Sequence, residues 1–182
     1  METSIIIAGF GGQGVLFAGQ LLAYAAMDSG HHVTWIPSYG PEMRGGTANC
    51  TVIIGDEPIG APIVTRPHIA VVLNQPSFNK YEPLLQPDGL LVVNSALIPT
   101  QTARTDVEAV YVPANHIAEA LGSVKMLNMV AVGALLAHRP VLSLAHVEQA
   151  LRDHLPQRKA DLRDANLQAL QRGHALAAAV PR

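Results

Sequence analysis

Cysteine is nearly absent from this sequence of 182 residues, which contains Cys50 alone. One cysteine cannot form an internal disulfide, and it cannot by itself hold an iron–sulfur cluster, which needs about four thiolates. Basic runs are absent too, and the formal net charge of −2 gives no electrostatic footprint for nucleic acid. We therefore expect neither a disulfide-stabilised domain, nor a self-contained iron–sulfur protein, nor a nucleic-acid-binding protein.

Long apolar runs are also missing. The longest apolar helical stretch, Met126–Leu136, is much shorter than the ~20 residues that cross a bilayer. The chain opens with Met-Glu-Thr, without a charged segment ahead of an apolar stretch, so no signal peptide is predicted. These features predict a cytoplasmic protein that makes no contact with a membrane.

Charged residues are scarce, at 14% of the chain against about 25% in typical soluble domains, while hydrophobic residues make up 49%. A domain of this size cannot bury so much apolar surface alone, and exposed apolar patches mark partner surfaces. The alternative explanation is an abundance of alanine, which inflates the hydrophobic count. The length fits a single domain over residues 1–182 and is too short for a dinucleotide-binding domain plus a separate catalytic domain.

What the sequence does contain is a glycine motif directly after a β-branched run. Residues 4–8 predict a strand, Gly9-x-Gly11-x-x-Gly14 a tight turn, and the apolar pattern beyond it a helix to about Ser29. Such a turn brings backbone N–H groups and the positive end of a helix close to an anion. The candidate ligand contacts in this turn are Gly9, Gly11, Gly12, Gln13 and Gly14.

A second glycine-containing loop, residues 37–46, follows the strand predicted at His32–Ile36. It lies at the carboxyl end of a strand, where open α/β sheets hold their ligands. Its candidate contacts are Tyr39, Glu42, Arg44 and Gly45. Arg44 either presents its guanidinium group to a carboxylate or phosphate or forms a structural ion pair with Glu42, and the sequence leaves both readings open.

The remaining segments alternate between strand and helix patterns. Further strands are predicted at 47–54, 69–73, 90–93 and 107–112, with a short one at 63–64, and helices at 78–85, 113–121, 125–138, 144–154 and 159–177. This order predicts an α/β fold, a three-layer Rossmann-like domain with a mostly parallel sheet and a helical C-terminal third.

A bound dinucleotide would need an acidic residue about 20 residues beyond the glycine turn, at the end of the second strand. Ile36, Pro37 and Ser38 occupy that position, so a turn that packs helix on strand or binds another anion is favoured. A free-standing NAD(P)-binding oxidoreductase is the alternative. Cys50 is expected to be buried and inert, and the histidines lack metal-ligand spacing, so neither catalytic nor metal-binding residues are predicted.

Together, the two glycine segments resemble the gamma subunit of the 2-oxoacid:ferredoxin (acceptor) oxidoreductases. This family includes the pyruvate, 2-oxoglutarate, ketoisovalerate and indolepyruvate enzymes. The resemblance covers essentially the whole chain, on the segments Ile7–Gly14, Ser38–Gly46, Leu73–Gln75 and Asn128–Leu135 and on Asn166 and Gly173.

The resemblance implies an accessory role in a larger enzyme. That enzyme oxidatively decarboxylates a 2-oxoacid to an acyl-CoA and CO₂ and passes the electrons to ferredoxin or another acceptor. Thiamine diphosphate, Mg and iron–sulfur clusters are then expected on other subunits, so this chain holds no cofactor of its own. Its partners would be alpha and beta subunits and, where one exists, a ferredoxin-like delta subunit, and the isolated chain would form a homodimer.

The resemblance also gives the two glycine segments a hypothetical ligand. The turn at Gly11–Gly14 and the loop that carries Arg44 would contribute to the coenzyme A site, because they offer backbone donors and one fixed cation. By analogy with other gamma subunits that are separate chains, 2-oxoglutarate or a related 2-oxoacid is the expected substrate of the complex.

Overall fold

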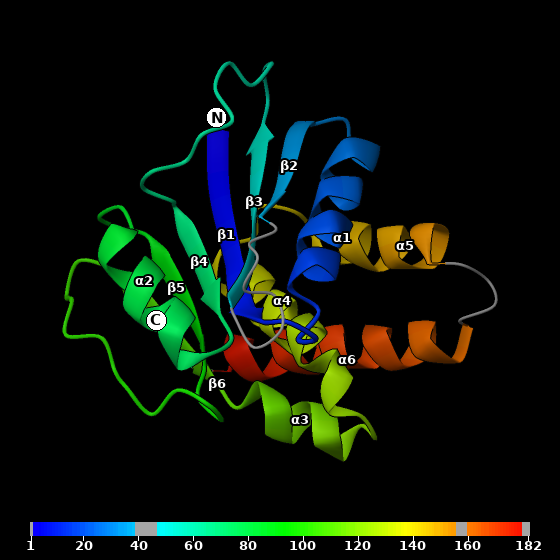
Figure 1. The fold of residues 1–182 in the computed structure, drawn as a ribbon. Helices are drawn as coiled ribbons and strands as arrows, with labels where there is room; N and C mark the ends of the chain where they lie inside the picture. Colours follow the sequence, from blue (N-terminus) through cyan, green and yellow to red (C-terminus); the bar gives the residue numbers. More distant parts are fainter. Residues whose placement is uncertain (1, 39–46, 156–159, 180–182) are drawn as a thin grey trace.

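The computed structural model describes residues 2–38, 47–155 and 160–179, which form a six-stranded sheet with helices on both faces (Figure 1). The strands are β1 (Glu2–Phe10), β2 (His32–Ser38), β3 (Thr47–Gly55), β4 (Ile69–Val72), β5 (Leu90–Asn94) and β6 (Glu108–Val112). The helices are α1 (Val15–Asp28), α2 (Gln75–Tyr81), α3 (Ala114–Ala120), α4 (Leu127–His138), α5 (Leu144–His154) and α6 (Ala160–Ala178). Two 3₁₀ turns, η1 (Glu82–Leu84) and η2 (Val124–Met126), follow α2 and precede α4.

The order of strands across the sheet is β2-β3-β1-β4-β5-β6. Each pair from β1 through β4 and β5 to β6 is parallel, whereas β3 runs antiparallel to both of its neighbours. In the middle of the sheet, Ile7 lies opposite Val71 on one side and Cys50 on the other. The predicted α/β class and the mostly parallel sheet are therefore confirmed.

Most helices cover one face of the sheet, where α1, α4, α5 and α6 pack over the larger apolar core (Figure 1). Alternate residues of β3 point into this core, including Cys50 and Val52, which are both fully buried. α4 is apolar nearly all round and is buried along most of its length, as its sequence predicts. The continuous apolar run of β4, Ile69–Val72, is buried on both faces, as expected of an inner parallel strand.

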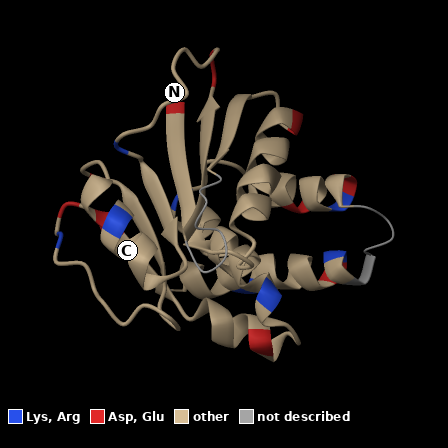
Figure 2. Cartoon of the chain, viewed as in Figure 1, with Lys and Arg blue, Asp and Glu red and all other residues tan. Residues whose placement is uncertain are grey.

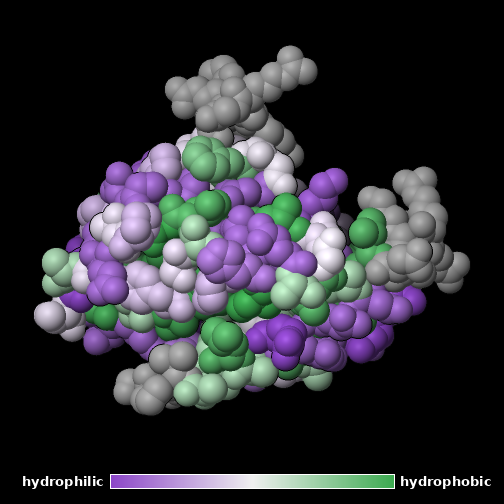
Figure 3. Space-filling model, turned by 90° about the horizontal axis from the view of Figure 1, so that it is seen from below, coloured by the Kyte–Doolittle hydropathy of each residue, from purple (hydrophilic) through white to green (hydrophobic). Residues whose placement is uncertain are grey.

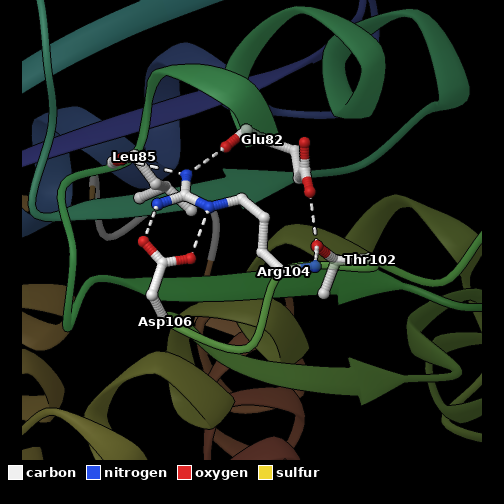
Figure 4. Close-up of polar contacts among 5 residues, drawn as sticks. All are labelled: Glu82, Leu85, Thr102, Arg104 and Asp106. Carbon is white, nitrogen blue, oxygen red and sulfur yellow. Dashed lines mark hydrogen bonds and ion pairs between the residues drawn. The ribbon is translucent and has the colours of Figure 1, made fainter.

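The opposite face is covered by α2, which packs Phe78 and Tyr81 against the smaller core, and by Leu85, which directly follows η1. The loop from β5 to β6 is fastened to this layer by Arg104 (Figure 4). Its guanidinium group forms a two-pronged pair with Asp106, at 2.9 Å and 2.6 Å, and donates to the carbonyls of Glu82 and Leu85, both at 3.0 Å.

The Arg104–Asp106 pair perturbs both partners in the expected direction. Its hydrogen bonds hold the pKa of the Asp106 carboxyl group below its usual value and raise the pKa of the Arg104 guanidinium group. Beside it, the Thr102 hydroxyl donates to the Glu82 carboxylate. The long loop over this face is thus held by charge-assisted hydrogen bonds together with the buried Ile98 side chain, which packs in the smaller core.

α4 and α6 cross in backbone contact because each has a glycine at the crossing. A Cβ atom at Gly173 would lie 2.0 Å from the Val130 carbonyl oxygen, and one at Gly133 would lie 2.1 Å from the Leu170 carbonyl oxygen. Near the end of α6, the buried His138 ring lies 2.6 Å from Glu108 Oε1 and 3.0 Å from the Ala177 carbonyl oxygen. These contacts fix the last helix against the sheet.

Three sequence predictions of local structure are wrong in detail. Residues 63–64 do not form a strand, and Pro113 is the N-cap of α3 instead of its first helical residue. β2 also continues through Pro37 to Ser38, which it can do because it is an edge strand and Pro lacks only an N–H group.

None of the helices within the described ranges is long and apolar enough to cross a membrane. Charged residues lie mostly on helices and loops and rarely on the sheet (Figure 2).

Candidate functional site

The glycine turn joins the carboxyl end of β1 to the start of α1. Gly12 and Gly14 have φ angles of 93° and 72°, in the left-handed region that favours glycine. Gly14 is the N-cap of α1, and among the described residues no side chain caps this helix and no acid lies in its first turn. The first N–H groups of α1 therefore stay available for an anion, which the helix dipole also favours.

Gln13 fastens the turn to the sheet. Its side-chain oxygen accepts a hydrogen bond from the Phe10 N–H group at 2.6 Å, and its amide nitrogen donates to the Leu73 carbonyl oxygen at 3.3 Å. The same side chain fills the space beside Gly9, where an added Cβ atom would lie 2.5 Å from the Gln13 oxygen. Of the candidate contacts, Gln13 and Gly9 thus shape the turn, while Gly11, Gly12 and Gly14 form its outer part.

Asn128, at the start of α4, contacts the turn from a segment 114 residues away. Its side-chain nitrogen donates to the Gly14 carbonyl oxygen at 3.0 Å, and a Cβ atom at Gly14 would lie 2.3 Å from that nitrogen. The side chain is only 3% exposed, and its Oδ1 atom has no hydrogen-bond partner within the described part of the chain. A buried acceptor without a partner is costly, and Asn128 pays this cost beside the glycine turn.

A cavity of about 400 Å³ opens beside Gly14 and Asn128. Its apolar wall is made by Phe17, Leu121, Met126, Leu155, Leu162 and Ala165. Its polar lining is Ser123, Lys125, Asn128 and Asn166, so none of the described lining residues is acidic. A helix N-terminus, one exposed lysine and an apolar wall together suit a ligand that joins an anionic group to a largely apolar arm.

Polar side chains also gather at the carboxyl ends of the neighbouring parallel strands. Asn94, at the end of β5, donates to the Leu73 carbonyl oxygen at 3.3 Å and to the Asn115 side chain at 2.8 Å. Asn74, directly after β4, caps α2 by accepting from the Ser77 N–H group at 2.9 Å. Both asparagines are fully buried or nearly so, and they brace the strand ends that carry the glycine turn.

Residues 39–46 of the second glycine loop lie outside the described residues, together with the candidates Tyr39, Glu42, Arg44 and Gly45. The described residues that flank it are Ser38 and Thr47. Thr47 pairs with Phe10 in the sheet, so it lies at the same edge as the glycine turn. The predicted contacts of this loop with a ligand stay predictions.

The strand order argues against a bound dinucleotide more strongly than the lack of an acidic residue at Ile36–Ser38 does. In dinucleotide-binding folds, the second strand lies beside the first and presents its acid to the ribose. Here the antiparallel β3 lies between β1 and β2, so the end of β2 at Ser38 is one strand away from the turn. The free-standing NAD(P)-binding alternative is therefore rejected.

Cys50 is buried at the centre of β3, as predicted. Burial raises the pKa of its thiol to about 11, and the neighbouring Trp35 and Gly19 offset only part of that effect. A thiol with such a pKa is a poor nucleophile at neutral pH. Among the described His, Cys, Asp and Glu residues, no group of three gathers as metal ligands would.

Sequence reasoning missed the contribution of α4 and η2 to this site. The apolar pattern of residues 125–138 predicts a buried helix, and it gives no sign of a ligand contact. The informative signal was an asparagine at the start of an otherwise apolar helix, because a buried amide requires partners. Lys125, just before it, is the cation nearest to this asparagine along the chain.

Known proteins resemble this chain in sequence. It matches the family described as pyruvate ferredoxin/flavodoxin oxidoreductase over residues 4–176. Ketoisovalerate oxidoreductase subunit VorA of Methanothermobacter thermautotrophicus is 41% identical over 136 residues, which are 75% of this chain but only 28% of that protein. 2-oxoglutarate synthase subunit KorC of Methanocaldococcus jannaschii is 34% identical over 97% of this chain and 95% of that subunit.

Solved structures resemble it in fold. The gamma subunit of keto/oxoacid ferredoxin oxidoreductase from Geobacter sulfurreducens is 30% identical, with a TM-score of 0.85 over 97% of both chains. 2-oxoglutarate:ferredoxin oxidoreductase from Magnetococcus marinus, solved with 2-oxoglutarate, coenzyme A and succinyl-CoA bound, has a TM-score of 0.88. It is 24% identical and matches 99% of this chain with 32% of its own, so this likeness shows the fold alone.

Proposed function

Because this chain belongs to the pyruvate ferredoxin/flavodoxin oxidoreductase family, we propose that it is the non-catalytic gamma subunit of a multi-subunit 2-oxoacid:ferredoxin (acceptor) oxidoreductase. The predicted resemblance to a gamma subunit is confirmed. The observation that carries the proposal is the end-to-end match to KorC, a separate subunit of a 2-oxoglutarate synthase. The complex would convert 2-oxoglutarate or a related 2-oxoacid and coenzyme A to an acyl-CoA and CO₂ in the cytoplasm, with two electrons passing to ferredoxin.

The redox cofactors of such an enzyme do not fit this chain. An iron–sulfur cluster needs about four thiolates, whereas the sequence contains one cysteine, and that cysteine is buried in β3. We assign thiamine diphosphate, Mg and the clusters to alpha and beta subunits and, where one exists, to a ferredoxin-like delta subunit. This chain would then contribute binding surface instead of reacting groups.

Coenzyme A does fit the residues around the glycine turn. The open end of α1 would take a phosphate group, and Lys125 would neutralise further negative charge. The Asn128 side chain, which lines the cavity, would lie beside the pantetheine arm, and the apolar walls would pack against that arm. Arg44, in the second glycine loop, is the further cation that we propose for this site.

The coenzyme A assignment is tested in the assembled complex with Arg44→Ala. Loss of a charge-assisted hydrogen bond to a phosphate predicts a rise of about tenfold or more in the apparent KM for coenzyme A. The KM for the 2-oxoacid should stay unchanged. Arg152→Ala is the matched control, because Arg152 is an exposed residue of α5 in a surface pair with Glu148. An unchanged KM for coenzyme A would contradict the assignment of Arg44.

The subunit role is tested by co-expressing the chain with the neighbouring larger subunits. We expect one complex that reduces a dye acceptor with a 2-oxoacid in a thiamine- and coenzyme A-dependent reaction, and a substrate panel would identify the 2-oxoacid. Titration of the isolated chain with NADH should give no binding in the micromolar range. Micromolar NADH binding, or failure to assemble, would contradict the proposed function.

A further inference from the structure

A second cavity, of about 500 Å³, lies between α3 and α6. We call it the α3–α6 groove, and it is lined by His116, Ile117, Ala120, Leu121, Arg172, Ala175 and Leu176. Leu121 also lines the cavity beside Gly14, so the two cavities adjoin at this residue. Leu121 therefore lies between the groove and the proposed coenzyme A site.

The groove combines an apolar floor with a cation that has no partner. Leu176 is 39% exposed, and the small side chains of Ala120 and Ala175 are exposed beside it. Arg172 is exposed too, and within the described part of the chain it forms no ion pair. None of the described lining residues is acidic, and Glu119 of α3 lies outside the lining. Figure 3 shows the molecule from below the view of Figure 1, and on this side apolar side chains are exposed between polar ones.

We propose that the α3–α6 groove receives a segment of a larger subunit of the complex, one that presents apolar side chains to Leu176 and a carboxylate to Arg172. This inference rests on the proposed function. The small residues allow a backbone to approach closely, the exposed leucine gives apolar area, and the uncompensated guanidinium group selects an acidic partner.

The size of the relatives supports a separate protein as the occupant. This chain corresponds to 28% of VorA and to 32% of the Magnetococcus marinus chain, so in those proteins the same domain is covalently joined to a much longer polypeptide. KorC of Methanocaldococcus jannaschii, by contrast, is a named subunit that this chain matches over 95% of that subunit's length, so such a subunit associates without a covalent link. A segment seated in the groove would also reach Leu121 and so close one wall of the proposed coenzyme A site.

Two exposed residues of the groove are changed to test the proposal, Leu176→Asp and Arg172→Glu. The controls are Met27→Asp, which places the same charge on an exposed apolar residue of α1, and Arg152→Glu on α5. Affinity of each variant for the co-expressed larger subunits is measured by biolayer interferometry. We expect each groove variant to weaken association about tenfold or more and each control to change it by less than about twofold. Circular dichroism checks that every variant is folded.

A photo-cross-linking residue at position 176 then identifies the occupant in the wild-type complex. The expected product joins this chain to an apolar segment of a larger subunit that contains Asp or Glu. A cross-link to a second copy of this chain, or full association by both groove variants, would overturn the proposal. The proposal would also be overturned if the groove variants associate normally but have a raised KM for coenzyme A, because the groove would then bind the small molecule. If the wild-type chain does not associate with the larger subunits, the proposed function itself fails.

Discussion

The crossing of α4 and α6 makes a sharp prediction for the substitution Gly173→Ala. In an exposed helix this change stabilises a protein by about 1 kcal/mol, because alanine has the higher helix propensity. Here the new Cβ atom would lie 2.0 Å from the carbonyl oxygen and 2.8 Å from the Cα atom of Val130, whereas ordinary contacts begin at 3.4 Å. The helices would have to move apart by more than 1 Å.

The cost of that movement decides the sign of the effect. The obstacle at Val130 is backbone, which cannot rotate away as the end of a flexible side chain can. Overpacking of this kind costs about 3 kcal/mol, at the upper end of the usual range, and the propensity gain offsets about 1 kcal/mol of it. We expect Gly173→Ala to lower the free energy of unfolding by about 2 kcal/mol.

Urea unfolding followed by circular dichroism measures this effect. The pair Gln168→Ala and Gln168→Gly provides the control, because Gln168 is exposed in the same helix and isolates the propensity term. There the alanine variant should be the more stable by about 1 kcal/mol. If Gly173→Ala matches or exceeds the wild-type stability, the two helices do not cross in backbone contact and the reasoning is wrong.

Four further predictions concern side chains of the fold and of the proposed site. At pH 8 the buried Cys50 thiol should react with a thiol reagent only after the protein unfolds. Because its pKa is raised to about 11, the neutral thiol stabilises the fold fully below about pH 9, and this contribution of about 2–3 kcal/mol should be lost as pH rises through about 11. In urea titrations, Cys50→Ala should lack this part of the loss of stability at alkaline pH. Arg104→Lys keeps the charge but loses the planar fork, so the free energy of unfolding should fall by about 1–2 kcal/mol in the same assay, and a wild-type value would contradict the role of the fork. Because Arg104 lowers the pKa of Asp106, the pair should stabilise the fold at any pH above the ordinary pKa of a carboxyl group. This stabilisation should be lost as pH falls through the lowered pKa of Asp106, and the Asp106→Asn variant should not show that loss. Asn128→Asp in the assembled complex places a negative charge beside α1 and should raise the KM for coenzyme A about tenfold, without changing the KM for the 2-oxoacid. If the variant and the wild type have the same KM for coenzyme A, Asn128 is not part of the coenzyme A site.

The sequence predicted the elements that a single strong local pattern specifies. The β-branched run before Gly9, the apolar run of β4 and the all-round apolar α4 each formed the structure that its pattern indicates. Ser143 also caps α5, by accepting a hydrogen bond from the His146 N–H group. Local patterns were sufficient there because burial and capping depend on residues close together in the chain.

Contacts between distant segments were not predictable in the same way. Strand periodicity is the same for a parallel and an antiparallel neighbour, so nothing in residues 47–54 indicated that β3 would lie between β1 and β2. By helix propensity alone, glycines at 133 and 173 are unfavourable, yet they are what lets these two helices touch. The contact between Gly14 and Asn128 likewise joins two segments that no periodicity connects.

The insertion of β3 explains how a glycine motif typical of dinucleotide folds can serve another ligand. The turn keeps its backbone geometry and the open end of α1, and these features suit an anion whatever the strand order. What changes is the neighbour: β3 fills the position from which a second strand would hold a ribose. The open cavity lies instead toward α4 and η2, where Asn128 and Lys125 are. An anionic ligand anchored on Gly14 would thus extend along these helices, away from β2, and this direction separates the site from that of a nicotinamide enzyme.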